Sequence, residues 1–147
     1  MPNQLVFTDK TIPFVYAVVC IMEIDEAKID LAPERAAGDE VQRVYDRLGE
    51  AVEDIAAWLR TYGVNCESEA PRGGSVNTCP LAAKAGMGWQ GNSSLLITQQ
   101  YGLRFRIATI YVQEKYFEYT DSDAHRWIEE YCRNCERACS AGQYMKK

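Results

Sequence analysis

Three cysteines near the end of the chain have a spacing that is typical of metal binding. Cys132, Cys135 and Cys139 form the pattern C-x2-C-x3-C. Bacterial ferredoxin-type sites use C-x2-C-x2-C-x3-C, in which closely spaced thiolates bind the irons of a cluster. The first position of that pattern falls on Glu129, and Ser140 stands where a proline usually follows. Because a carboxylate is an uncommon cluster ligand, the pattern predicts an iron–sulfur site that is incomplete or completed from elsewhere.

Two other interpretations of these cysteines stay open. His125 is the only histidine, and with the three cysteines it would make a Cys3His zinc site of unusual spacing. Metal-free thiols, including a redox pair formed by the first two cysteines, are the other alternative. Cys20, Cys66 and Cys79 are isolated in the sequence, where a cysteine is usually a small buried apolar residue.

A glycine-rich segment is the second candidate for chemistry. Residues 85–94 read A-G-M-G-W-Q-G-N-S-S. The segment lacks the Gly-Lys-Ser/Thr of a Walker loop, and it leads into a predicted strand instead of the helix that follows G-x-G-x-x-G. Glycines here permit positive φ or close approach of the backbone to a large ligand. A tight turn with Trp89 packed in the core is the alternative.

The clearest predicted element is an amphipathic helix that follows Asp39 as N-cap, has Gln42 at N3 and ends at Gly63 as C′. Apolar residues recur along one face at three- and four-residue steps: Val41, Val44, Tyr45, Leu48, Val52, Ile55 and Leu59. Segment 13–22 is β-branched and aromatic, which predicts a central strand. Segment 28–38 lacks a clear period, which predicts a connection.

Shorter elements are expected in the remainder of the chain. In order, the sequence predicts a strand at 64–67, a loop at 68–77, a helix at 79–85 stopped by Gly86, a strand at 94–98, a turn at 101–102, a strand at 104–112 and a helix from Ser122. The strand at 104–112 is the expected hairpin partner of the strand at 94–98.

Composition narrows the classes of function. The chain has 147 residues, a net charge of −5 and a pI near 4.9, a balance that disfavours nucleic acid as a partner. Arg104 and Arg106 could still form a local basic patch, so a tRNA partner is left open. The apolar run at 12–22 is too short for a membrane-spanning helix, and no signal peptide precedes it. We therefore expect no membrane insertion and a location in the reducing cytoplasm.

The segment from Pro80 to Val112 resembles the core motif of the epoxyqueuosine reductase and reductive dehalogenase superfamily. That motif reads A-x-x-A-G-[LM]-G-W-x-G-K-[NS]-[TS]-L-L-I-[TS]-P-x-[YF]-G-x-x-x-R-[LI]-[GA]. Here the chain reads P-L-A-A-K-A-G-M-G-W-Q-G-N-S-S-L-L-I-T-Q-Q-Y-G-L-R-F-R-I-A from Pro80. The resemblance is specific over 81–112 and extends from Pro13 to Cys139, with further matches at 59–63 and 127–135.

The resemblance implies an α/β domain similar to the nitroreductase-like fold that holds cobalamin, beside a domain with two [4Fe-4S] clusters that supply electrons. The positions that match the cofactor-binding motif are Gly86, Gly88, Trp89, Gly91, Ser93 and Arg106. The positions that match cluster ligands are Cys132, Cys135 and Cys139.

The chain also departs from the family pattern. Epoxyqueuosine reductases resemble one another in a V-D-[ST]-G-P segment whose aspartate donates a proton, whereas residues 69–74 here read E-A-P-R-G-G. Glu69 is the candidate that takes the place of this aspartate. Asn92 stands where lysine is usual, Gln99 where proline is usual, and the chain stops at Lys147, before a second set of cluster cysteines.

We therefore expect the α+β class, as an α/β sandwich with a nitroreductase-like mixed sheet flanked by helices and a C-terminal helical cysteine motif. Residues 1–121 are the expected corrinoid-reductase-like domain and 122–147 a partial ferredoxin-like cysteine segment, together one compact unit. The expected function is a [4Fe-4S]-binding oxidoreductase that passes electrons to a corrinoid. The alternative is a non-catalytic binding or assembly module. Expected partners are a redox donor or a missing ferredoxin-like domain, and a second copy joined through an exposed edge strand.

Overall fold

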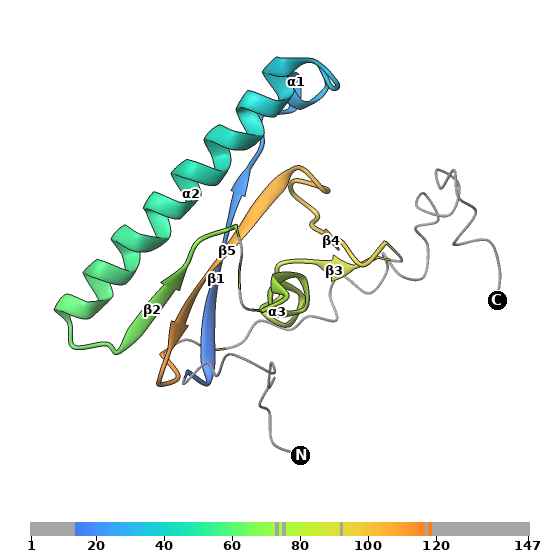
Figure 1. Ribbon diagram of the computed structural model, residues 1–147. Coiled ribbons are helices and arrows are strands. Elements are labelled where there is room, and N and C mark those ends of the chain that lie inside the picture. Colours follow the sequence, from blue (N-terminus) through green and yellow to red (C-terminus); the bar gives the residue numbers. More distant parts are fainter. Residues whose placement is uncertain (1–13, 73, 75, 92, 117, 119–147) are drawn as a thin grey trace, which may run out of the picture.

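The computed structural model describes residues 14–72, 74, 76–91, 93–116 and 118 (Figure 1). Its elements are β1 (Tyr16–Glu23), α1 (Glu26–Ile29), α2 (Arg35–Thr61), β2 (Cys66–Glu69), α3 (Thr78–Lys84), β3 (Trp89–Gln90), β4 (Leu96–Ile97) and β5 (Phe105–Val112). Helices combined with antiparallel strands confirm the α+β class. Over the described ranges, no helix has both the length and the apolar composition needed to cross a bilayer.

β5 is the central strand of the three-stranded sheet. The strand order is β1-β5-β2, and both pairings are antiparallel. Tyr16 of β1 and Cys66 of β2 both pair with Val112, from opposite sides of β5. The strand predicted at 13–22 is present as β1, but its predicted central position is wrong. β5 takes the centre because residues 108–112 are buried without interruption, whereas no residue of β1 is fully buried.

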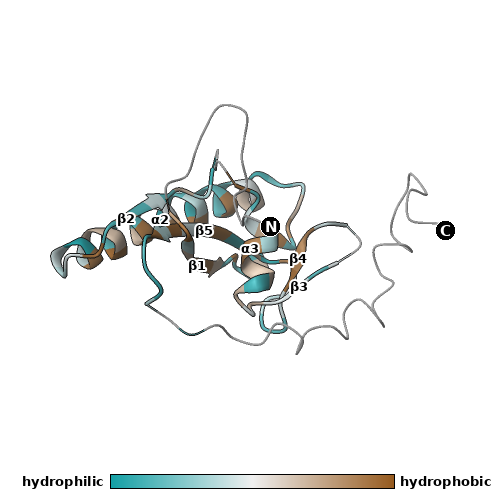
Figure 2. Ribbon diagram, turned by 90° about the horizontal axis from the view of Figure 1, so that it is seen from below, coloured by the Kyte–Doolittle hydropathy of each residue, from teal (hydrophilic) through white to brown (hydrophobic). Residues whose placement is uncertain are grey.

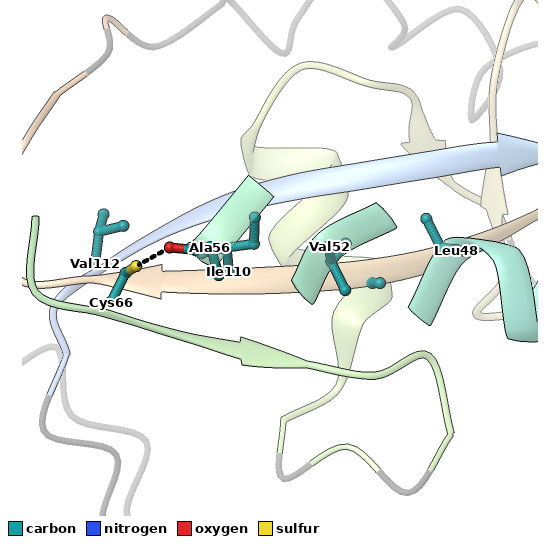
Figure 3. Packing of buried hydrophobic residues seen from close by; sticks show 7 residues of the cluster. Leu48, Val52, Ala56, Cys66, Ile110 and Val112 are labelled. Carbon is teal, nitrogen blue, oxygen red and sulfur yellow. Dashed lines mark hydrogen bonds between the residues drawn. The ribbon is translucent and has the colours of Figure 1, made fainter. Parts of the chain in front are cut away.

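The two faces of this sheet belong to two apolar clusters. Side chains alternate between the faces of a strand, so every second residue of β5 contacts the cluster on the α2 side. That cluster contains Leu48, Val52, Ala56, Cys66, Ala108, Ile110 and Val112 (Figure 3). On the other face, Phe105 packs with Ala82 of α3 and Leu96 of β4. Figure 2 shows apolar residues of β1 and β5 between α2 and α3.

The segment predicted as a connection, 28–38, is partly helical. It contains the end of α1, and α2 begins at Arg35, five residues earlier than predicted. Glu40 accounts for this arrangement, because its side chain is only 1% exposed and accepts hydrogen bonds from Arg43 Nε at 2.8 Å and Lys28 Nζ at 2.9 Å. The bond from Arg43, with that from Lys28, lowers the pKa of Glu40 to about 2. The ion pair with Lys28 joins α1 to α2, whereas the pair with Arg43 lies within α2.

The predicted end of α2 is confirmed. Gly63 has a φ of +79°, and its N–H donates to the Arg60 carbonyl at 3.0 Å. The next N–H, of Val64, donates to the Leu59 carbonyl at 3.3 Å, which completes a Schellman motif. β2 begins two residues after the predicted start of the strand at 64–67, and α3 begins one residue before the predicted helix at 79–85.

The predicted pairing of 94–98 with 104–112 is wrong. β4 pairs with β3, with Trp89 opposite Ile97, while β5 pairs with β1 and β2. The turn itself is present, since Gly102 has a φ of +58° and exchanges backbone hydrogen bonds of 2.9 and 3.0 Å with Thr98. All eight residues of β5 pair with β1, whereas β4 has only two residues that could pair.

Candidate functional site

The glycine segment, residues 85–94, follows α3, contains β3 and leads into β4. Gly86 has a φ of +74°, and its N–H donates to the Ala83 carbonyl at 3.0 Å. Asn77 caps the other end of α3, where its Oδ1 accepts from the Cys79 backbone N–H at 3.2 Å. Because a residue with a side chain rarely adopts positive φ, Gly86 ends the helix as the sequence predicts.

Gly88 and Gly91 lie close to β4. A Cβ on Gly88 would fall 2.2 Å from the carbonyl oxygen of Ile97, and a Cβ on Gly91 would fall 2.8 Å from Ile97 Cδ1. The close backbone approach that these glycines permit is therefore an approach to the chain's own strand. Their predicted contact with a cofactor stays a prediction, as does that of the half-buried Trp89.

Two of the predicted binding residues hold buried polar atoms without partners. Ser93 Oγ and Arg106 Nε are both buried, and neither has a hydrogen-bond partner among the described residues. Arg106 does use Nη1, which donates to the carbonyl of Phe105 at 2.9 Å. A buried polar atom without a partner is costly, so these two atoms are the best candidates in the motif for contacting a ligand.

A recess of about 220 Å³ lies between α2, α3 and the start of β5, and Arg106 is the only residue of the predicted set that lines it. Its walls are Tyr45, Pro71, Thr78, Cys79, Leu95, Leu96, Leu103, Phe105, Arg106 and Ile107. The guanidinium carbons of Arg72 and Arg106 lie 4.7 and 4.9 Å from the centre of the Tyr45 ring. The fold thus brings two arginines from distant segments to one aromatic side chain.

Sequence reasoning missed Tyr45 and Arg72 as site residues. Tyr45 fits the apolar face of the helix, and Arg72 lies in a Pro- and Gly-containing loop where a charged residue is ordinary. The available signal was the pair Pro71-Arg72, which stands where the resembling family has a different segment. Nothing in the local pattern indicates that Tyr45 contacts both Arg72 and Arg106.

Glu69 lies at the end of β2, where its Oε2 accepts a hydrogen bond from the hydroxyl of Tyr111. Burial, followed by this hydrogen bond and the charges of Glu69 and Glu67, raises the pKa of Tyr111 above its ordinary value. Tyr111 therefore stays protonated and donates. Glu69 does not line the recess at Arg106, and its proton-donor role stays a prediction.

The predicted cluster ligands, Cys132, Cys135 and Cys139, lie outside the described residues. The described cysteines, Cys20, Cys66 and Cys79, are free thiols. Cys66 Sγ donates to the carbonyl of Ala56 (Figure 3), and burial raises the pKa of Cys20. Within the part of the chain that the structure describes, no three His, Cys, Asp or Glu side chains come together in a way that could hold a metal ion.

The recess does not fit a whole corrinoid. Pockets that enclose drug-sized ligands have about 300–1,000 Å³, and about 220 Å³ is smaller than this range. The space beside Gly88 is filled by the backbone of Ile97. Ser93 Oγ and Arg106 Nε are suitable polar contacts. The described residues could therefore contact a corrinoid along one side only.

Comparison with known proteins gives several relatives. The chain is 31% identical over 125 residues to tetrachloroethene reductive dehalogenase of Desulfitobacterium hafniense, a match that covers 84% of this chain and 22% of that protein. It is 40% identical over 63 residues to an epoxyqueuosine reductase of Francisella cf. novicida, covering 43% of this chain and 17% of the relative. An epoxyqueuosine reductase of Gloeobacter violaceus is 27% identical over 144 residues, covering 90% of this chain and 41% of the relative.

No protein-family profile matches the chain. The matched part is about a fifth of the length of the reductive dehalogenase and less than half of either epoxyqueuosine reductase. The match to the reductive dehalogenase nevertheless extends well beyond the glycine motif on which the resemblance rests. This chain is a partial relative of the epoxyqueuosine reductase and reductive dehalogenase superfamily.

Proposed function

We propose that this chain is part of a reductase of the epoxyqueuosine reductase and reductive dehalogenase type, and that it binds a [4Fe-4S] cluster and contacts a corrinoid. The observation that carries the proposal is the similarity to tetrachloroethene reductive dehalogenase over 84% of the chain. Both kinds of relative are named as enzymes of reduction, which supports reductive chemistry here.

The proposed cluster ligands are Cys132, Cys135 and Cys139, with Glu129 or a group from another polypeptide at the fourth position. A bound cluster of this kind supplies single electrons, often at low potential. The proposed electron source is a redox donor protein or a ferredoxin-like domain. The free thiols of the described cysteines suit a reducing compartment, which supports a cytoplasmic location.

The proposed corrinoid contact is one edge of a site in a nitroreductase-like fold. Its residues are Gly86, Gly88, Trp89, Gly91, Ser93 and Arg106. Because Ser93 Oγ and Arg106 Nε have no hydrogen-bond partner among the described residues, they are the atoms proposed to hydrogen-bond the ligand. The other walls would come from outside the described residues, for example from a second copy that pairs along β1, which in the described sheet pairs with β5 alone.

Metal analysis tests the cluster directly. We expect anaerobically reconstituted protein to hold about four irons and four sulfides per chain, and Cys135→Ser to lose most of both. Cys20→Ala is the matched control, because Cys20 is a half-buried free thiol of β1 outside the proposed ligand set. It should keep the wild-type iron content.

Three results would contradict the cluster. An iron content that is the same in Cys135→Ser as in wild type would show that these cysteines are not the cluster ligands. About one zinc per chain would indicate a structural zinc site instead. No metal after reconstitution would favour a non-catalytic binding module.

A separate experiment tests the corrinoid contact. After gel filtration with cobalamin, we expect cobalt to stay with the wild-type protein and to be lost from Arg106→Gln.

A further inference from the structure

The recess at the start of β5 contains a positive charge that the described residues do not neutralise. Arg106 is half-buried and forms no ion pair with any described residue. Its Nη1 donates to a backbone carbonyl, while its buried Nε has no hydrogen-bond partner among these residues. Removing a charged group from water is costly unless it is paired. An anion placed in the recess would offset this cost.

A second guanidinium adds to the positive charge. Arg72 contacts the same Tyr45 ring as Arg106, with centroid distances of 4.7 and 4.9 Å. The only ion pair of Arg72 within the described ranges is a long one, in which its Nη2 lies 3.5 Å from Asp46 Oδ1 and both side chains are about half exposed. Asp46 is thus paired with Arg72, while Arg106 has no ion pair within the described residues, although the whole chain has a net charge of −5.

The walls of the recess indicate the rest of the ligand. Thr78 adds a hydroxyl-bearing side chain to the lining, whereas Phe105 and Ile107 line the recess with apolar surface. Leu95 and Leu103 also line it, and they are 52% and 49% exposed. A ligand with an anionic end and an apolar body would cover both kinds of surface.

We propose that Arg106 and Tyr45, which line the recess, form a binding site for a small organic anion, a carboxylate or a phosphate ester joined to an apolar group. Arg72, which contacts the same Tyr45 ring outside the lining, adds positive charge beside it. The planar guanidinium matches the two oxygens of such a group. The volume of about 220 Å³ sets the size to roughly that of a substituted benzene. The site shares Arg106 with the proposed corrinoid contact, whereas Tyr45 and Arg72 belong neither to that residue set nor to the proposed cluster ligands.

Calorimetric titration of the full chain, without added metal or cobalamin, tests this site. The probes are benzoate, phenyl phosphate, inorganic phosphate and the neutral analogue benzyl alcohol. We expect saturable binding of benzoate or phenyl phosphate at about millimolar concentration. Whichever of the two binds more tightly decides between a carboxylate and a phosphate ligand. Inorganic phosphate should bind more weakly because it leaves the apolar wall uncovered.

Arginine variants separate this site from general charge attraction. Arg106→Lys keeps the charge but loses the planar fork, and we expect it to weaken binding about tenfold. Arg72→Gln changes an exposed loop residue, so it should fold normally and weaken binding about fivefold. Arg35→Gln makes the same change of charge at a side chain that is 92% exposed on α2, outside the recess, and should leave binding unchanged.

Three outcomes would overturn the proposal. Benzyl alcohol binding as tightly as the anions would reduce the recess to an apolar pocket. An equal loss in Arg35→Gln and Arg72→Gln would reduce the binding to net charge. Absence of saturable binding of both organic anions to the wild-type chain would remove the site altogether, whatever the iron and cobalt measurements give.

Discussion

Gly88 and Ile97 are in such close contact that position 88 has no room for a side chain. A Cβ on residue 88 would lie 2.2 Å from the Ile97 carbonyl oxygen and 3.2 Å from the Cα of Thr98. Both neighbours are backbone atoms, so they cannot move without moving β4. The ribbon of β3 and β4 thus depends on glycine at this position, independently of any ligand.

This contact predicts the cost of Gly88→Ala. The added methyl must push β4 away from β3 and disturb the packing of Leu96 in the second apolar cluster, so we expect the free energy of unfolding to fall by about 2–3 kcal/mol. Urea denaturation of both proteins measures this. Gly91→Ala is the matched control, because its Cβ meets only the flexible end of the Ile97 side chain, and should cost about 1 kcal/mol or less. An equal cost for both variants would contradict the close backbone contact.

The buried Glu40 carboxylate predicts a loss of stability in acid. The pKa of Glu40 in the folded chain is about 2, below the ordinary value of 4.5. A group whose folded pKa is lowered stabilises the fold above its unfolded pKa. This contribution is lost as the pH falls from about 4.5 through about 2.

The variant Glu40→Gln tests this contribution. We expect it to lower the free energy of unfolding by about 1–3 kcal/mol at neutral pH, because the buried carboxylate loses its charge-assisted hydrogen bonds with the exposed side chains of Lys28 and Arg43. The difference from wild type should shrink below about pH 4. Asp39→Asn changes a neighbouring exposed ion pair with Arg35 and should cost no more than about 0.5 kcal/mol. A difference that is constant with pH would mean that the charge of Glu40 is not what stabilises the junction.

The burial of Tyr111, together with its hydrogen bond to Glu69, predicts a loss of stability in alkali. The pKa of Tyr111 is raised in the folded chain, so the unfolded chain releases this proton first and stability falls as the pH rises above about 10. In urea denaturation, Tyr111→Phe should cost about 1 kcal/mol at neutral pH and should weaken the alkaline decline. Tyr62→Phe changes a ring that is 71% exposed and serves as the control. An alkaline decline that is as steep in Tyr111→Phe as in wild type would exclude Tyr111 as its source.

Local signals made much of the fold predictable. The end of α2 at Gly63 and the turn at Gly102 follow from glycines that must adopt positive φ, and the buried face of α2 follows from its apolar period. The start of α2 was not predictable in this way. It depends on Glu40, a charged residue buried against Lys28 from the preceding helix, and a charge on a helix is ordinarily a sign of exposure.

Pairings between distant segments were harder to predict. β5 alternates well enough to be a hairpin strand, but its partner in β1 is about 90 positions away in the sequence, as in the pair of Ile21 and Ile107. The candidate site likewise depends on contacts between segments that are distant in the sequence. Arg106 is indicated by a motif, whereas Tyr45 and Arg72 reach it only because α2 and the loop after β2 meet at the start of β5.

Replacing glycine by alanine should have opposite effects inside α2, at Gly38, and just after its end, at Gly63. Gly38 lies inside α2 with open space around its Cβ position, so Gly38→Ala should raise the free energy of unfolding by about 0.5–1 kcal/mol through its better helix propensity. Gly63 also has open space, but its φ is +79°, so Gly63→Ala should lower it by about 1–2 kcal/mol. Neither change alters a contact, so urea denaturation reports the backbone alone. Destabilisation by both would place Gly38 outside regular helix, whereas stabilisation by both would mean that α2 continues past Thr61.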